Sequence, residues 1–423
     1  MDNVTHALAG GLIAAAAVAL TDHRARKNAV LSEVATAADG TREFGRTTAV
    51  LAVVAAEFPD IDLVYVGRTL DGGKLAYMLH HRGHTHTVLF ALLSAIVLWA
   101  ITLAVVQKCR AEPLRWSLLA VAFAGTGSHL LLDFTNSYGV HPFWPVESSW
   151  YYGDALFIIE PWLWVVSLPV LWYFTRISAV RVACAVALAA ILVLAWTVDL
   201  VGRDVALALT IGALLWGLAV RAAHVNRRWL YGVFGWSVIV GMFFVASMRA
   251  RDAVLAAVEP GTFRDVSLTP APSNPLCFRA LAVQMERESY EVTAASVAPF
   301  PALRNALACA ALTKESIAAA ARDGTMLPHS RATSGAVHWE QRWSAPRTSL
   351  VKLVKQNCEI AAAMRFMRVP FWRVDSQGQI VFTDLRYGDR NGGFAEITTP
   401  RQRTGCVGVV PGWRPPRADI SGE

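Results

Sequence analysis

Long apolar segments fill the first 248 residues of this chain and constrain its fold more than any other feature. A helix needs about 20 mainly apolar residues to cross the hydrocarbon core of a bilayer. Only 17% of the residues are charged, below the roughly 25% of ordinary soluble domains. We therefore predict a mainly α-helical, polytopic membrane domain over residues 1–248. The candidate spans are 4–20, 47–66, 87–106, 115–134, 160–175, 182–198, 205–220 and 230–248.

The second segment carries three carboxylates, Glu57, Asp60 and Asp62, around Pro59. A proline at this position ends or kinks a helix. We expect a helix over residues 47–58 that is about 18 Å long at 1.5 Å per residue, which is too short to cross the membrane cleanly. Of the eight segments, this one is therefore predicted to be broken, with its carboxylates near the membrane surface.

Basic residues are distributed unequally between the loops that connect these segments. If all eight cross, the loops on one side hold thirteen arginines and lysines, and those on the other side hold four. The positive-inside rule places the richer set in the cytoplasm. The N-terminus and the region after residue 248 are then predicted to be extracytoplasmic. An aromatic belt at the membrane interface is expected from Trp144, Trp150, Tyr151, Tyr152 and Trp162.

Residues 249–423 are predicted to form a separate α+β soluble domain of unknown role. Its four cysteines, Cys277, Cys309, Cys358 and Cys406, are enough for two disulfides with three alternative connectivities, which fits an oxidising compartment. Buried thiols in the cytosol are the alternative interpretation. Residues 299–323 favour a helix, residues 371–388 favour two strands around a turn, and residues 269–275 favour a loop.

Histidines gather in the first part of the chain, where eight of the eleven lie within residues 1–160. The densest group is HHRGHTHT, residues 80–87, directly before an apolar segment. His129 and Asp133 are four residues apart, so on a helix they share a face and can bind one ion. In the predicted topology these groups reach the same side of the membrane. Ionisable groups at membrane depth are costly enough to imply a function.

Histidine nitrogens and carboxylate oxygens without nearby cysteines suit zinc, manganese or iron(II). Asp2 and His6 repeat the four-residue spacing, and Gly10 and Gly11 would let neighbouring helices approach closely. The number of candidate ligands allows one or two ions, and two-metal sites typically perform hydrolytic displacements. The predicted metal ligands are His6, Asp60, His81, His86, His129 and Asp133.

Four motifs in order give the sequence a family resemblance. DNVTHALAG, FPDIDLVY, HHRGHTHT and GSHLLLDFTNSYG, followed by FWP and IIEP, resemble the YdjM-like membrane-bound metal-dependent hydrolases of the bacterial inner membrane. The resemblance covers roughly residues 1–175. The pattern is also distantly similar to the zinc-dependent phospholipase C and P1-type nuclease group, which are helical enzymes with a zinc cluster of histidines and aspartates.

The resemblance implies roles for particular residues. His129 and Asp133 would be zinc ligands, with Asp60, His86 and His6 as further candidates, and Arg82 would face the substrate. Two departures stand out. Glu160, which we expect to cap a helix beginning at Pro161, stands where family members usually carry aspartate. His84 stands where they commonly carry an apolar residue.

We therefore predict an integral membrane metal-dependent hydrolase that acts on a phosphoester or lipid-like substrate at the outer face of the cytoplasmic (inner) membrane. Asp62 or Glu57 would serve as general base, and Arg82 would hold an anionic group. The alternative is a non-enzymatic metal-binding membrane protein or a transporter, although the sequence lacks the internal repeats of many transporters. The expected partners are membrane lipid and a small-molecule or lipid substrate. Nucleic acid is not expected, because no basic helix or aromatic-interleaved basic patch occurs.

Overall fold

The structure is a computed structural model of the chain that divides into two compact units. It describes residues 1–27, 38–66, 73–112, 114–310, 326–329, 334–388, 393–406 and 408–422. The helical unit comprises residues 1–61, 85–134 and 158–241, and the C-terminal unit comprises residues 62–84, 135–157 and 242–423. Two segments of the second unit therefore lie between helices of the first in the sequence.

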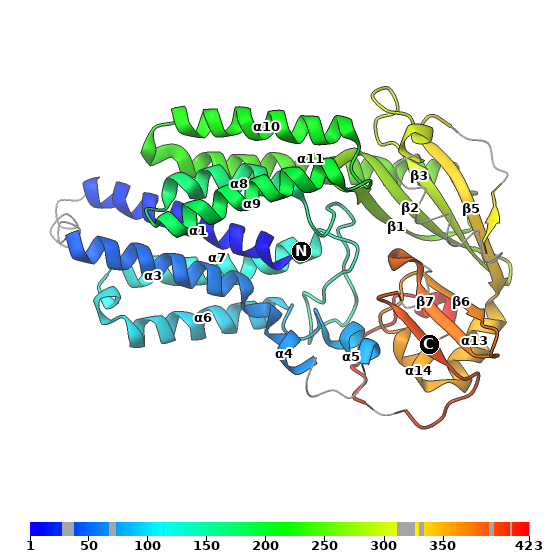
Figure 1. The fold of residues 1–423 in the computed structure, drawn as a ribbon. Coiled ribbons are helices and arrows are strands. Elements are labelled where there is room, and N and C mark those ends of the chain that lie inside the picture. Colours follow the sequence, from blue (N-terminus) through cyan, green and yellow to red (C-terminus); the bar gives the residue numbers. More distant parts are fainter. Residues whose placement is uncertain are drawn as a thin grey trace. The chain divides into compact units, whose positions relative to one another are not determined.

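The helical unit is a bundle whose helices run side by side (Figure 1). Within the described residues, six helices are long and apolar enough to cross a membrane, and α8 is a shorter apolar helix. Each predicted segment overlaps a helix, so the predicted fold class is confirmed and the chain is a membrane protein; α3 is not one of the six. The helices are α1 (Asn3–Lys27), α3 (Ala38–Glu57), α6 (Val88–Val105), α7 (Leu114–Phe134), α8 (Pro161–Phe174), α9 (Ser178–Thr197), α10 (Arg203–Ala222) and α11 (Arg228–Ala257).

Helix α3 corrects one prediction and confirms another. It has 20 residues, or about 30 Å at 1.5 Å per residue, because it begins in polar sequence before the apolar run that marked its expected start. The prediction of a short half-helix is therefore wrong. The break itself is confirmed, since α3 ends at Glu57 and the chain continues as the 3-10 turn η1 (Phe58–Ile61) and the helix α4 (Asp62–Val66).

Two glycines let the helices on either side approach the backbone of α3. A Cβ added at Gly10 of α1 would lie 2.7 Å from the carbonyl oxygen of Ala52, and one at Gly125 of α7 would lie 2.6 Å from the Cβ of Ala55. Gly10 is four residues after His6, and Gly125 is four residues before His129. Because residues four apart share a helix face, this packing turns both histidines toward the end of α3.

The C-terminal unit is built from two antiparallel sheets and several short helices. The larger sheet has the order β1-β2-β3-β5-β4, and the smaller has the order β6-β7-β8. The strands are β1 (Phe263–Ala271), β2 (Asn274–Glu286), β3 (Ser289–Val297), β4 (Leu327–Pro328), β5 (Val337–Pro346), β6 (Pro370–Val374), β7 (Ile380–Asp384) and β8 (Glu396–Thr399). The helices and turn are α5 (Gly73–His80), α13 (Arg347–Gln356), α14 (Cys358–Ala363), η4 (Leu385–Tyr387) and α15 (Ala418–Ser421).

Of the three secondary-structure predictions for the C-terminal unit, one is confirmed, one is wrong and one falls mostly outside the described residues. The two strands expected over residues 371–388 are β6 and β7, paired from Val374 with Ile380. The loop expected over residues 269–275 is wrong, because β1 and β2 extend through it and leave only a tight turn, in which Ser273 has φ +59°. Most of the helix expected over residues 299–323 lies outside the described residues.

Hydrogen bonds explain why residues 62–84 and 135–157 belong to the C-terminal unit. The indole of Trp413 donates to the carbonyl oxygen of Leu79, and the indole of Trp150 donates to that of Arg365, at 2.8 and 2.7 Å. Met78, Tyr138 and Trp150 lie in the same buried apolar cluster as Trp413. The expected interfacial belt is therefore wrong for Trp150, which is 8% exposed and packs inside a protein core.

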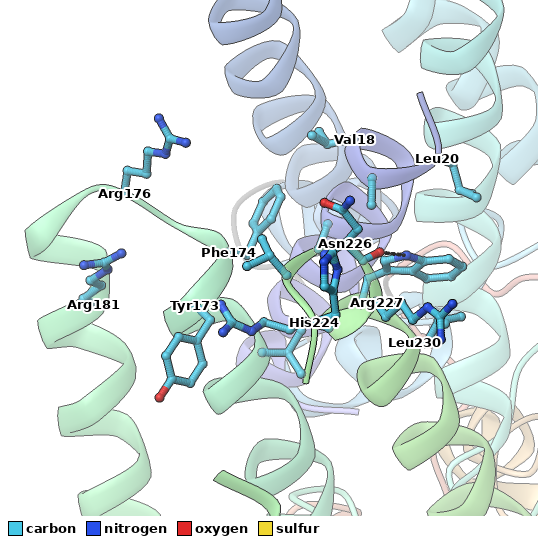
Figure 2. A pocket seen from close by; sticks show the side chains of 16 residues that line it. Val18, Leu20, Tyr173, Phe174, Arg176, Arg181, His224, Asn226, Arg227 and Leu230 are labelled. Carbon is cyan, nitrogen blue, oxygen red and sulfur yellow. Dashed lines mark hydrogen bonds between the residues drawn. The ribbon is translucent and has the colours of Figure 1, made fainter. Parts of the chain in front are cut away.

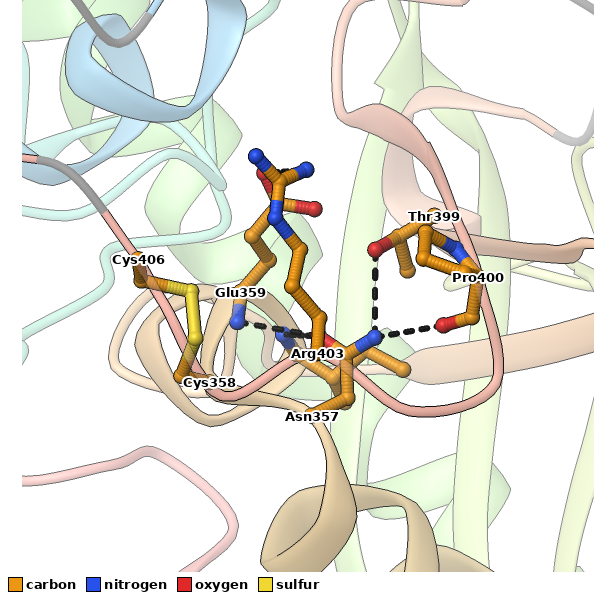
Figure 3. Close-up of a disulfide and its surroundings, with 8 residues drawn as sticks. Asn357, Cys358, Glu359, Thr399, Pro400, Arg403 and Cys406 are labelled. Atoms are coloured by element: carbon orange, nitrogen blue, oxygen red, sulfur yellow. Dashed lines mark hydrogen bonds and ion pairs between the residues drawn. A yellow bond between two sulfur atoms is a disulfide. The ribbon is translucent and has the colours of Figure 1, made fainter.

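Two disulfides join the four cysteines of the C-terminal unit, Cys277 with Cys309 and Cys358 with Cys406. The predicted pairing of these cysteines is confirmed, and one of the three connectivities is selected. Beside the second disulfide, the side-chain amide of Asn357 donates to the hydroxyl of Thr399 and to a backbone carbonyl (Figure 3). The disulfide and these bonds hold the start of α14 to the chain that follows β8.

Candidate metal centre

Four potential metal ligands converge where three elements of the helical unit end or begin. Asp60 lies in η1, directly after Pro59 ends α3. His86 precedes Thr87, whose hydroxyl caps α6 by accepting from the backbone N–H of Phe90. His129 and Asp133 lie on one face of the last turns of α7. The proline break and the helix cap therefore bring residues from distant sequence positions to one place.

The side-chain atoms of these residues are spaced as ligands of a single ion. Nε2 of His86 is 3.3 Å from a carboxylate oxygen of Asp60 and 3.0 Å from one of Asp133. Nε2 of His129 is 3.4 and 3.5 Å from the same two carboxylates, and 3.0 Å from Nε2 of His86. One atom from each residue lies within 4.8 Å of the others. Tetrahedral zinc with bonds of roughly 2.0–2.2 Å separates its ligand atoms by about 3.3–3.6 Å.

The other ring nitrogens of the two histidines are already engaged. Nδ1 of His129 is 2.6 Å from the carbonyl oxygen of Ala56, and Nδ1 of His86 is 2.9 Å from the hydroxyl of Thr85. A proton on Nδ1 that is donated to these oxygens leaves the lone pair on Nε2, where it faces the cluster. Metal-binding histidines are usually oriented in this way by outer hydrogen bonds.

The cluster is buried, with a partial opening at one ligand. The side chains of His86 and His129 are 0% exposed and that of Asp133 is 1% exposed, whereas that of Asp60 is 10% exposed. Two carboxylates in such a small buried volume repel each other unless positive charge lies between them, from a bound cation or from protonated imidazoles. The donor set therefore fits a divalent transition-metal ion, and Asp60 lies on the side nearest solvent.

His6 and the backbone amino group of Met1 adjoin the cluster. The His6 ring stacks on that of His129 with a centroid separation of 3.8 Å, and its Nε2 is 3.3 Å from an Asp133 oxygen. The amino group of Met1 contacts the same carboxylate. The structure thus places His6 beside the four ligands. Asp2, which shares its spacing with His6, instead caps α1 by accepting from the backbone N–H of Thr5 at 3.0 Å.

Three further predicted site residues belong to the C-terminal unit: Asp62 begins α4, and His81 and Arg82 follow α5. One oxygen of Asp62 is 3.1 Å from Nδ1 of His81, and the other accepts the backbone N–H of Arg82 at 3.0 Å. A carboxylate with two such contacts orients the His81 ring and the loop. Arg82 has φ +59°, a left-handed backbone conformation that costs energy for a residue other than glycine.

The side chain of Arg82 points to the protein interior. It is 3% exposed, donates from Nη1 to the side-chain oxygen of Asn136 at 3.0 Å, and lies 4.8 Å from the ring centre of Tyr138. An arginine that only anchors a chain to lipid head groups would be exposed. Asn136 was not among the predicted site residues, although the FTNSYG motif that contains it was one of the signals.

Two further glutamates, Glu57 and Glu160, lie at the ends of helices in the helical unit. Glu57, a predicted general base, is the last residue of α3 and belongs to the helical unit. Glu160 caps α8 by accepting the backbone N–H of Trp162 at 3.2 Å, and Pro161 follows as the first helical residue. The predicted cap is therefore confirmed.

The fold and this cluster define a class, namely helical membrane proteins with a histidine–aspartate site of metal-binding composition. Residues 1–203 match the family described as YdjM inner membrane protein. Over these residues the chain is similar to that family, which confirms the YdjM resemblance of its motifs there. No curated protein and no solved structure matched the chain.

Proposed function

We propose that this protein is a metal-dependent hydrolase of the bacterial inner membrane, acting on a phosphoester or lipid-like substrate. The observation that carries the proposal is the cluster of Asp60, His86, His129 and Asp133, with ligand atoms within 4.8 Å of one another. Zinc is the favoured ion, and manganese or iron(II) would suit the same donors. When bound, such an ion acidifies water and stabilises negative charge on a reacting oxygen.

Different side chains would bind the metal ion, face the substrate and accept a proton. His86, His129 and Asp133 are held by helix packing and outer hydrogen bonds, so they would fix the ion. Asp60, the ligand with the most exposure, marks the side from which a substrate would arrive. Glu57 precedes Asp60 by three residues and is the proposed proton acceptor. Asp62 is better suited to positioning, because both of its oxygens have partners.

Arg82 is the proposed binding group for an anionic part of the substrate. It precedes His86 by four residues. The guanidinium offers a planar fork that matches phosphate, and its burial would strengthen the attraction. A phosphoester is favoured over an amide or ester for this reason, and lipid head groups supply phosphoesters at the depth where polar residues adjoin membrane helices.

The test is hydrolysis by the purified full chain. Bis-p-nitrophenyl phosphate and a short-chain phospholipid would be incubated with the protein before and after chelation, and again after zinc or manganese is restored. We expect activity that is lost on chelation, regained with metal, and absent from Asp133→Asn, while Asp252→Asn, an exposed aspartate on α11, retains it. Equal rates in the Asp133 variant would overturn the proposal.

A structural metal centre is the second candidate, and the near-complete burial of His86, His129 and Asp133 favours it. Structural zinc sites are closed and take all four ligands from protein. In that case chelation would lower the unfolding temperature, and no substrate would be turned over at any metal concentration. The same preparations distinguish the two candidates.

The proposed orientation places the C-terminal unit outside the cytoplasm. The unequal basic loops and the two disulfides support this orientation. A reporter fused after residue 423 should be active only in a form that works outside the cytoplasm. Activity of a reporter that works only in the cytoplasm would reverse the assignment.

A further inference from the structure

A cavity of about 890 Å³ lies in the helical unit (Figure 2), and none of its described lining residues comes from α3, α6 or α7, which position the four metal ligands. Its walls come from the second half of α1, the corner between α8 and α9, and the turn between α10 and α11. Leu20 in this wall is fourteen residues after His6, which is about 21 Å along a helix at 1.5 Å per residue. The cavity is therefore a separate site.

Basic side chains dominate the polar part of the wall. Arg176, Arg181, Arg227, Arg228 and His224 line the cavity, and none of the described lining residues is acidic. Arg176 and Arg227 are exposed and form no ion pair with another described residue. A cavity with this many positive charges and no described carboxylate favours an anionic occupant.

Two of the arginines are held in place by the protein. Nε of Arg181 donates to the carbonyl oxygen of Thr175 at 3.0 Å, and Nε of Arg228 donates to that of Val220 at 3.1 Å. The Arg228 guanidinium also lies 4.5 Å from the ring centre of Tyr173. Fixed guanidinium groups lose little freedom when they bind, and their planar donors match phosphate oxygens.

The rest of the wall is apolar. Val18 and Leu20 of α1 and Phe174 of α8 contribute hydrocarbon (Figure 2). Trp229 also lines the cavity, and its indole N–H donates to the carbonyl oxygen of Asn226. Tryptophan with one polar end is typical of the membrane interface. The volume falls within the roughly 300–1,000 Å³ of ligand sites.

We propose that this cavity binds the phosphate head group of an anionic phospholipid, with the beginning of the acyl chains against α1. Basic pockets between membrane helices bind anionic head groups through the same combination of charge and apolar wall. A soluble phosphate compound shares the charged part of this chemistry. The apolar wall favours the lipid, because inorganic phosphate leaves that surface unused.

The test measures lipid binding to the purified full chain in detergent by native mass spectrometry. The probes are dioleoyl phosphatidylglycerol as the anionic lipid, dioleoyl phosphatidylcholine as the lipid without net charge, and glycerol phosphate as the soluble phosphate compound. The variant is Arg176→Gln/Arg227→Gln, whose side chains are exposed and therefore dispensable for folding. The charge-matched control is Arg110→Gln/Arg221→Gln, which changes two exposed basic residues, one after α6 and one in the last turn of α10, that do not line the cavity.

We expect phosphatidylglycerol to bind at least about 10-fold more tightly than phosphatidylcholine, and the cavity variant to lose most of this preference while the control keeps it. Equal binding of the two lipids, or equal losses in the two variants, would overturn the site. Glycerol phosphate that binds as tightly as the lipid would overturn the lipid assignment. None of these outcomes depends on hydrolysis, so the proposed enzyme activity can fail independently.

Discussion

Arginines are the partners of Asp154, Asp265 and Asp384 in the C-terminal unit, whereas histidines surround Asp60 and Asp133 in the helical unit. Asp384 and Arg386 are both 0% exposed and 2.9 Å apart, and Arg368 lies 2.8 Å from both Asp154 and Asp265. Each of these carboxylates has a permanent cation beside it. In the helical unit, Asp60 and Asp133 face imidazole nitrogens that are neutral in the state that binds metal. The first arrangement is neutralised by fixed arginines. In the second, the amino group of Met1 contacts Asp133, and further positive charge must come from a bound cation or from protonated histidines.

The largest effect should come from breaking a buried ion pair in the C-terminal unit. Arg386→Met leaves Asp384 buried beside an apolar side chain, and loss of one partner of such a pair costs about 3–5 kcal/mol. Arg386 also donates to the carbonyl oxygens of Ser137 and Phe366, so these contacts are lost too. Denaturant unfolding of the full chain measures the cost. Bound metal should stay unchanged in the folded fraction, and the exposed Lys352→Met should be neutral.

Metal addition should stabilise only the protein with an intact cluster. At a metal concentration of 100 times the dissociation constant, binding to the folded state contributes about 2.7 kcal/mol. The thermal midpoint of chelator-treated protein should therefore rise with zinc in the wild type and remain constant in His129→Ala. A rise of equal size in both proteins would place the bound ion elsewhere.

Arg82→Lys should separate substrate binding from metal binding. The change keeps the charge and removes the planar guanidinium that can form two parallel hydrogen bonds to phosphate. Metal content should therefore remain normal while turnover falls roughly 10-fold or more, which corresponds to at least about 1.4 kcal/mol in activation free energy. Single-turnover assays with a phosphodiester measure the loss. Full activity would remove Arg82 from the proposed site, and loss of metal would make it a structural residue of its loop.

Asp265→Asn should produce a smaller and pH-dependent loss. Burial alone would raise the pKa of Asp265, but the charge and hydrogen bonds of Arg368 hold it well below its usual range. A carboxylate whose pKa is lowered on folding stabilises the folded state at pH values above its pKa in the unfolded chain, about 3.9. This contribution is lost as the pH falls toward the pKa in the folded state. The difference in unfolding free energy between wild type and variant, about 1 kcal/mol at pH 7 for a charged hydrogen bond partly exposed to solvent, should therefore shrink below pH 4.

Sequence periodicity predicted the helices well and the segments between them poorly. The apolar runs and Pro59 predicted the helices and the helix break correctly, because the length of a run and the backbone chemistry of proline determine these features locally. Residues 62–84 and 135–157 carry no signal that they pack with strands more than a hundred residues later. Their assignment depends on contacts such as Trp413 with Leu79, which only the tertiary fold creates.

The candidate site was predictable as a set of residue types and less so as a geometry. The four-residue spacing of His129 and Asp133 placed both on one helix face, as found. The approach of Asp60 depends on Gly125, whose missing side chain lets α7 reach α3, and His86 is placed by the start of α6. The partners that orient the histidines, Ala56 and Thr85, could not be predicted, since a backbone carbonyl and a neighbouring hydroxyl leave no motif.

Metal stoichiometry of the purified full chain tests the central claim most directly. Elemental analysis after dialysis against a weak chelator should find at least one transition-metal ion per chain in the wild type and in His224→Ala, whose histidine lies outside the cluster. The variant His86→Ala/His129→Ala should hold less than a tenth as much while remaining folded. Equal metal content in all three proteins, or none in any of them after reconstitution with zinc, manganese or iron(II), would contradict the assignment of Asp60, His86, His129 and Asp133 as a metal centre.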